Sequence, residues 1–416
     1  MPPICTTHPW LTFTIDMRQA SPRLWLLLGE ARSKCHHLAG VPLSQSVAQD
    51  LHQVFLARGV HATAAIEGNM LTERQVLDIV KSNTQPSASQ SYAEREISNI
   101  VAATNEILDQ VEKDGIKLIL VGDIKEYNRK ILSGLPVDEY VEPGAYAKVQ
   151  VGVYGYKGAP TNKYDELMEQ LCSWLNGPDF SDDEHVVYGL VKSVIAHLYL
   201  VWIHPFGDGN GRTARLLEAR ILLEAGIPST ACHLLSDHYN RTRPEYYRHL
   251  AEASKNGGDV LPFIDYAITG FVGLLRDQLV VVKNQQWAVS WVNYVHSIFS
   301  NRKSKTEKRQ RDLLLSLTDA GGVIHRDEIR RLSPIVAEEY SGLTDRTVFR
   351  DLNALVRQQL IVKIGDGYRA NRELILQFVP RARKGDLAAQ LHQVNSLLYE
   401  QGDEEEDDQA DLFEDV

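Results

Sequence analysis

The sequence predicts an all-α core that is interrupted by one short β-hairpin and followed by a smaller domain of three helices and a second hairpin. Apolar residues recur at helical spacing in the first hundred residues, as in 24–38, 47–56 and 92–111. Over 143–160 this spacing gives way to strand-like alternation and glycines. After Asn301 the pattern changes again. These three observations set the fold class.

Two consecutive helices joined by a glycine-rich turn are predicted at the centre of the core. The first covers 182–203 and is strongly apolar, and the second covers 212–224 and ends before Gly226. More helix follows through 259–300, whereas the polar stretch 82–91 is typical of an exposed loop.

The C-terminal region has the element order of a winged helix-turn-helix domain. Helices are expected over 306–317, 327–332 and 344–360, followed by a hairpin with Asp366-Gly367 in its turn. Residues 303–373 carry fourteen Lys or Arg and eleven Asp or Glu, a difference of +3. A clearly basic face is expected of a DNA-binding domain, so this charge is mild.

Composition excludes several classes of protein. The chain has 416 residues, of which 44% are hydrophobic and 24% charged, and this excludes a disordered chain, a fibrous repeat and a coiled coil. The net charge is −11, and residues 403–416 hold nine acids and no base, so −11 − (−9) leaves −2 for the rest. The folded part is therefore nearly neutral, and the acidic tail is expected to be disordered.

The cellular compartment is indicated by the cysteines and the N-terminus. The four cysteines are scattered without metal-ligand spacing. No run approaches the roughly 18 uninterrupted apolar residues of a membrane span, and no basic stretch followed by an apolar run opens the chain. We expect a cytoplasmic protein with free thiols and no membrane partner.

One stretch, HPFGDGNGRTAR at 204–215, concentrates residues suited to phosphate chemistry. Its glycines let the backbone turn tightly, and the helix that begins near Arg212 adds free N–H groups and a positive dipole end. Arg212 and Arg215 share a helix face and can clamp a polyphosphate. Asp208 can hold Mg²⁺, and His204 titrates near neutral pH and can act as a general base.

This stretch resembles the signature of the Fic family, His-x-Phe-x-(Asp/Glu)-Gly-Asn-Gly-Arg-x-x-Arg, and matches every specified position. The resemblance implies the all-α Fic core and transfer of a nucleoside monophosphate, usually AMP from ATP, to a protein hydroxyl. In the family roles His204 deprotonates the target hydroxyl, and Asp208 holds Mg²⁺ on the phosphates. The Gly209 and Gly211 backbone and Asn210 bind phosphate oxygens, and Arg212 and Arg215 bind the β- and γ-phosphates.

Residues 63–68, TAAIEG, resemble the inhibitory motif of the same family, (Ser/Thr)-x-x-x-Glu-(Gly/Asn). The resemblance implies that Glu67 pairs with Arg215 and keeps the guanidinium away from the γ-phosphate, so that the enzyme is autoinhibited. In some relatives the same glutamate orients water to remove AMP, and this reverse activity stays open.

A hairpin expected over Ala147–Val153 resembles the family's flap, which docks the target segment as an added strand. Val149, Val151 and Val153 supply its alternation, although a surface hairpin without this role is the alternative.

Two further interpretations concern the adenine pocket. Tyr246 and Tyr247 resemble a tyrosine pair beside the nucleobase in relatives, with ordinary helix packing as the alternative, and His197 is expected to be a buried structural histidine.

The resemblance divides the chain into four parts. These are an N-terminal helical region with the inhibitory helix (1–95), a Fic catalytic core (96–285), a linker helix with the winged-helix domain (286–375), and a C-terminal helix with the acidic tail (376–416). The expected partners are ATP and a target protein with a Ser, Thr or Tyr hydroxyl. A second copy of the chain, and DNA bound through 303–373, are further expected partners. Transfer of UMP or phosphocholine, and a nucleotide-sensing DNA-binding regulator, are competing hypotheses.

Overall fold

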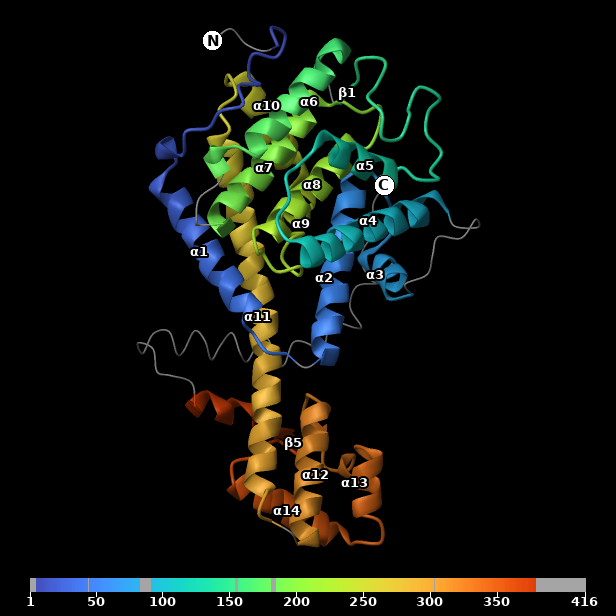
Figure 1. Ribbon diagram of the computed structural model, residues 1–416. Helices are drawn as coiled ribbons and strands as arrows, with labels where there is room; N and C mark the ends of the chain where they lie inside the picture. Colours follow the sequence, from blue (N-terminus) through green and yellow to red (C-terminus); the bar gives the residue numbers. More distant parts are fainter. Residues whose placement is uncertain are drawn as a thin grey trace, which may run out of the picture. The chain divides into compact units, whose positions relative to one another are not determined.

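The computed structural model describes residues 5–43, 45–82, 91–153, 156–180, 185–302 and 304–378 (Figure 1). The chain divides into two compact units, Met1–Leu279 and Val280–Val416. Most of the predicted loop at 82–91 and the acidic tail lie outside the described residues.

Unit 1 is mostly helical, which confirms the predicted all-α core. Its α-helices are α1 (Pro22–Ala39), α2 (Gln45–Ile66), α3 (Glu73–Ser82), α4 (Tyr92–Asp114), α5 (Val121–Ile131), α6 (Tyr164–Leu175), α7 (His185–Ile203), α8 (Asn210–Glu224), α9 (Leu234–Arg241), α10 (Arg243–Lys255) and the first part of α11 (Leu261–Phe299). Short 3-10 helices lie at Met17–Gln19, Thr161–Lys163 and Pro178–Phe180. The helices expected from apolar spacing are all present, with ends shifted by a few residues or, for α2, extended by a further ten.

Helices α7 and α8 form the centre of unit 1. Almost every side chain of α7 is buried, because the helix is apolar on all faces and has neighbours around it. Helices α2, α4 and α5 pack against α8 (Figure 1). Among the described helices, α7 is the one long and apolar enough to cross a membrane, but 78% of its most apolar window is buried inside the protein.

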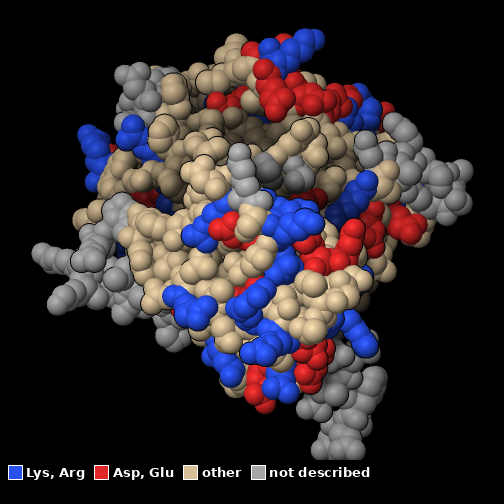
Figure 2. All heavy atoms as spheres, turned by 90° about the horizontal axis from the view of Figure 1, so that it is seen from below, with Lys and Arg blue, Asp and Glu red and all other residues tan. Residues whose placement is uncertain are grey.

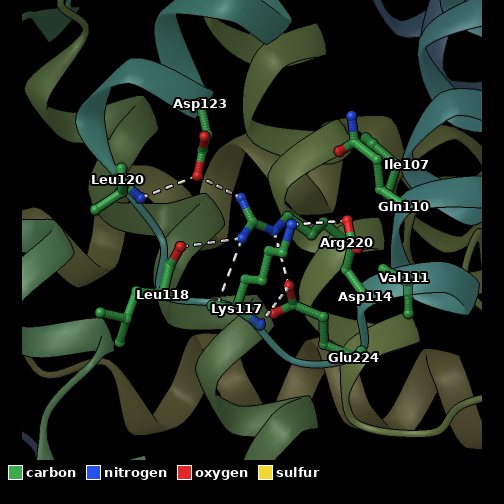
Figure 3. Close-up of a pocket in the computed structure, with 11 residues that line it drawn as sticks. Ile107, Gln110, Val111, Asp114, Lys117, Leu118, Leu120, Asp123, Arg220 and Glu224 are labelled. Atoms are coloured by element: carbon green, nitrogen blue, oxygen red, sulfur yellow. Dashed lines mark hydrogen bonds and ion pairs between the residues drawn. The ribbon is translucent and has the colours of Figure 1, made fainter.

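Arg220 of α8 ties the connection between α4 and α5 to this centre (Figure 3). Its Nη1 donates to Asp123 Oδ2 at 2.7 Å, its Nε to Glu224 Oε1 at 2.9 Å, and its Nη2 to the carbonyl of Leu118 at 3.2 Å. A cavity of about 370 Å³ lies beside these groups. Because the guanidinium and the carboxylates satisfy one another, the role of Arg220 is structural.

The hairpin lies further along the chain than the alternation predicts. Strand β1 (Gly152–Val153) pairs antiparallel with β2 (Tyr156–Lys157), and the carbonyl of Val151 accepts from Gly158 N at 2.9 Å, so Val149 precedes the paired residues. The expected range over 147–153 is therefore wrong in its boundaries. The reason is tertiary, because Ala147 N donates instead to the carbonyl of Pro205 at 2.8 Å.

The described part of unit 2 contains the end of α11, three further α-helices and a three-stranded antiparallel sheet. These elements are α12 (Lys305–Asp319), β3 (Ile324–His325), α13 (Pro334–Glu339), α14 (Asp345–Arg357), β4 (Ile361–Ile364) and β5 (Gly367–Ala370), with 3-10 helices at Ile329–Arg331 and Arg372–Phe378. The strand order is β3-β5-β4. A buried apolar cluster that includes Trp291, Leu313 and Leu352 holds them together.

The second helix of unit 2 is not where the sequence predicts it. Residues 327–332 contain only a 3-10 turn, and the α-helix begins at Pro334. Ser333 caps that helix by accepting a hydrogen bond from Val336 N at 3.2 Å, and proline is favoured at the first helical position. The first and third helices and the β4–β5 hairpin are confirmed.

Candidate active site

His204 directly follows the last residue of α7 and is held as a neutral base. Its Nδ1 lies 3.2 Å from the carbonyl of Val201, and a carbonyl only accepts, so the proton sits on Nδ1 and leaves the Nε2 lone pair free. Burial lowers the pKa of His204, while the Val201 carbonyl and the carboxylates of Glu67 and Asp208 raise it. The net pKa is below the ordinary value.

Two backbone contacts from the segments around the hairpin bracket His204. Ala159 N donates to the carbonyl of Ile203 at 3.0 Å, and Ala147 N donates to the carbonyl of Pro205 at 2.8 Å. His204 itself has φ 52°, a left-handed conformation that non-glycine residues rarely adopt. The surrounding chain therefore imposes the orientation of the imidazole.

The turn after His204 brings the predicted glycines to the N-terminus of α8. Gly209 is the N-cap, with φ 76°, a conformation that glycine adopts without a steric penalty. Asn210 uses its amide to close the turn, because Oδ1 accepts from Phe206 N at 3.0 Å and Nδ2 donates to Phe206 O at 2.7 Å. The first N–H groups of a helix have no acceptor within it, so this end suits an anion. Phosphate contacts of Gly209, Asn210 and Gly211 stay a prediction.

Asp208 supplies a carboxylate at the edge of this turn. Its Oδ1 accepts from Gly209 N at 2.5 Å and from Arg212 Nη2 at 2.8 Å, and its side chain is 43% exposed. The described residues contain no group of three or more His, Cys, Asp or Glu side chains placed to hold a metal ion. Mg²⁺ at Asp208 would therefore take its other ligands from phosphate oxygens and water, a donor set that it prefers.

Glu67 lies against the N-terminus of α8 and pairs with Arg215. Arg215 Nη2 donates to Glu67 Oε1 at 2.6 Å and to the carbonyl of Thr63 at 3.1 Å. The carboxylate lies so close to Gly211 that a Cβ there would collide with it. Desolvation alone would raise the pKa of Glu67, but the charges of Arg215 and Arg212 hold it below the ordinary value. A carboxylate thus occupies the place suited to an anion.

A second carboxylate holds the other arginine. Arg212 Nη1 donates to Glu96 Oε1 at 2.5 Å, and both residues are buried. Asn69 Nδ2 donates to Glu96 Oε2 at 2.8 Å. Sequence reasoning missed Glu96 and Asn69, because a glutamate in an amphipathic helix looks like a solvated one and its partner lies 116 residues away.

The tyrosine pair packs into the core behind the site. Tyr246 is 2% exposed, and its hydroxyl shares a 2.8 Å hydrogen bond with His197 Nε2. His197 is fully buried, which confirms its structural interpretation. The half-buried Tyr247 ring lies 5.2 Å from that of Tyr246. A place for either tyrosine beside a nucleobase stays a prediction.

Taken together, these groups place a candidate general base beside groups suited to binding phosphate. A neutral imidazole stands beside a helix N-terminus, and two buried arginines follow on the same helix. Both arginines keep a buried Nε without a hydrogen-bond partner among the described residues.

Comparison with known proteins identifies the domain that carries this site. Residues 118–222 match the model of the Fic/DOC family. The chain is 30% identical over 210 residues to Protein adenylyltransferase Fic of Nematostella vectensis, covering 50% of this chain and 45% of the relative. It is 31% identical over 207 residues to Protein adenylyltransferase fic-1 of Caenorhabditis elegans, covering 50% and 38%. The chain therefore carries a Fic domain, and it spans less than half the length of these relatives.

The fold has a solved counterpart. The crystal structure of a Fic family protein from Desulfovibrio desulfuricans G20 aligns with a TM-score of 0.52 and 22% identity, over 86% of this chain and 98% of that one. At this identity the likeness supports the fold and not the function.

Proposed function

We propose that the chain is an autoinhibited protein adenylyltransferase that transfers AMP from ATP to a Ser, Thr or Tyr hydroxyl of a target protein or of itself. The observation that carries the proposal is the position of His204, whose Nδ1 lies on the Val201 carbonyl, beside the N-terminus of α8 and the guanidinium groups of Arg212 and Arg215. The relatives from Nematostella vectensis and Caenorhabditis elegans are named for the same activity.

The proposed reaction is an in-line displacement at the α-phosphorus. His204 Nε2 takes the proton of the target hydroxyl, the hydroxyl oxygen bonds to the α-phosphorus, and the bond to the bridging oxygen breaks as pyrophosphate leaves. The arginines and the N–H groups of α8 stabilise the negative charge that develops on the phosphate oxygens. Mg²⁺, held by Asp208 when bound, would neutralise further charge.

Autoinhibition by Glu67 is the second part of the proposal. The carboxylate lies against Gly211 and accepts a hydrogen bond from Arg215 Nη2. In its absence a phosphate oxygen would accept that hydrogen bond. Its side chain is 34% exposed, so it has a route into solvent when nucleotide displaces it. The same carboxylate is a base for water, and AMP removal is therefore a second reaction open to this site.

Intact-mass spectrometry of the Glu67→Gly protein, incubated with ATP and Mg²⁺, tests the proposal. We expect an added AMP group, and we expect none in the Glu67→Gly, His204→Ala protein. An adduct after incubation with UTP or CDP-choline and not with ATP would replace AMP by UMP or phosphocholine. No adduct with any of the three donors would reject self-modification.

We propose a second function for one surface of unit 2. We infer that residues 303–373 form a winged helix-turn-helix domain, and that α14 contacts duplex DNA as a role secondary to AMP transfer. The exposed residues of α14 include Arg346, Arg350, Asn353 and Arg357, whose spacing places them on one helix face. Figure 2 shows Lys and Arg side chains gathered in the lower middle of the face that it draws. Arginine and asparagine are common contacts to phosphates and base edges.

An electrophoretic mobility-shift assay with genomic fragments tests this role. The full chain is expected to shift duplex DNA at low salt, and the Arg346→Ala, Arg350→Ala protein to shift it at least about tenfold less, because each phosphate contact contributes to a salt-dependent affinity. Equal shifts by both proteins, or none by either, would reject α14 as a DNA-binding surface.

A further inference from the structure

Glu96 of α4 holds two groups at once from a buried position. One carboxylate oxygen accepts from Arg212 Nη1 and the other from Asn69 Nδ2. Glu96 is 2% exposed and Arg212 is 3% exposed. Removing Arg212 at this depth would leave Glu96 without a counter-charge, and removing Glu96 would leave Arg212 with the partly exposed Asp208 alone. The pair is therefore a fixed part of the fold.

Glu67 differs from Glu96 in each of these respects. It follows the last residue of α2, its side chain is 34% exposed, and the next residue is Gly68. Gly68 has φ 96°, which glycine adopts without a steric penalty, and its N donates to the carbonyl of Ala65 at 3.0 Å, so the backbone here is capped. Asn69, one residue further, stays fastened to Glu96 and to the carbonyl of Ala93 at 3.1 Å. The partly exposed side chain of Glu67 can therefore turn away from Arg215 while the backbone and Asn69 stay in place.

We propose that Glu96 is the positioning residue that keeps Arg212 directed at the phosphates, while Glu67 competes for Arg215 alone. The assignment rests on the proposed function, in which Arg212 contacts phosphates beyond the α-phosphate. Arg212 has Nη1 on Glu96 and Nη2 on Asp208, and its buried Nε has no hydrogen-bond partner among the described residues. Because the guanidinium is rigid and planar, fixing Nη1 and Nη2 fixes the direction of Nε.

Glutamine is the informative substitution at position 96. Its amide has a single oxygen for the two donors, Arg212 and Asn69, and it carries no charge. In the Glu96→Gln protein the guanidinium loses its buried counter-charge and is drawn toward Asp208, the remaining carboxylate partner. The direction of Nε is then lost, although the side chains keep nearly the same volume.

Calorimetric affinities for ATP, ADP and AMP test the proposal, with every variant made in the Glu67→Gly protein. We expect Glu96→Gln to weaken ATP and ADP about tenfold, the value of one charge-assisted contact, and to leave AMP within about twofold, since Arg212 does not contact the α-phosphate in this assignment. A structural defect alone would weaken all three nucleotides alike. That outcome, or unchanged ATP affinity, would overturn the proposal.

Matched variants separate positioning from general damage. Asn69→Ala removes the other contact of Glu96 and leaves the ion pair with Arg212, so its loss of ATP affinity is expected to be smaller than that of Glu96→Gln. Arg212→Ala and the double variant Arg212→Ala, Glu96→Gln are expected to bind ATP equally, because Glu96 acts through Arg212. Additive losses in the double variant would contradict this. If Glu96→Gln does not fold, Glu96→Asp keeps the charge and is expected to show a smaller loss for ATP with none for AMP.

Binding and transfer fail independently in this design. If Glu96→Gln weakens ATP and ADP but not AMP, and the Glu67→Gly protein labels no protein with AMP, the role of Glu96 is supported and the proposed function is rejected. If AMP labelling is normal but Glu96→Gln weakens all three nucleotides equally, the proposed function is supported and the role of Glu96 is rejected. A Glu67→Gly protein that binds none of the three nucleotides would overturn both.

Discussion

The two ion pairs of the site differ in how firmly the fold holds them. Arg212 and Glu96 are both buried, and a third residue, Asn69, fastens the carboxylate. Arg215 is buried as well, but its partner Glu67 is 34% exposed and directly follows the end of a helix. Under the proposed function, the fold holds Arg212 ready for phosphate, whereas Arg215 becomes accessible only when Glu67 leaves it.

The largest effect on the transfer rate is expected when the proposed general base, His204, is removed. In the Glu67→Gly protein, His204→Ala is expected to reduce labelling with radioactive ATP by about a hundredfold to ten-thousandfold, the range of general base catalysis. ATP affinity should change little, because His204 contacts the target hydroxyl rather than the outer phosphates. Labelling that survives the substitution would remove His204 from the reaction.

The two ion pairs are expected to contribute unequally to the free energy of unfolding. Glu96→Ala leaves Arg212 buried with only a partly exposed aspartate as partner, and we expect a loss of about 3–5 kcal/mol in the free energy of unfolding. Glu67→Ala should cost about 1 kcal/mol or less, because its carboxylate is partly solvated and the Thr63 carbonyl still accepts from Arg215. Urea denaturation measures both values. Equal losses in the free energy of unfolding would mean that the fold holds the two ion pairs equally firmly.

The pH dependence is the smallest expected effect. Catalysis needs neutral His204, so the transfer rate of the Glu67→Gly protein should rise with pH and reach a plateau. Burial holds the pKa of His204 below its ordinary value, and removing Glu67 takes away a charge that raises it, so the midpoint is expected below about 6.5. A pH–rate profile with a midpoint above that value would show that burial does not set the pKa.

Local signals in the sequence predicted the contiguous part of the site well. The turn from His204 to Arg215 is specified by residues that are neighbours in the chain, and the structure brings them together as expected. Glu67 was also found, since its motif is local. Its pairing with Arg215 followed from the family resemblance, and the structure contains that contact.

Features that depend on distant partners were missed or displaced. Glu96 has no local signature, because its meaning comes from Arg212 across the fold. The hairpin moved because Ala147 pairs with Pro205, a contact that alternation at 149–153 does not encode. The helix expected over 327–332 was the exception, since the Ser333-Pro334 start signal was local and was overlooked.

Labelling by the wild-type and Glu67→Gly proteins, side by side with radioactive ATP and Mg²⁺, tests the central claim most directly. If Glu67 blocks a site that is otherwise complete, Glu67→Gly should label at least about tenfold more strongly, the value of one charged hydrogen bond. Equal labelling by the two proteins, or labelling by neither, would contradict the account.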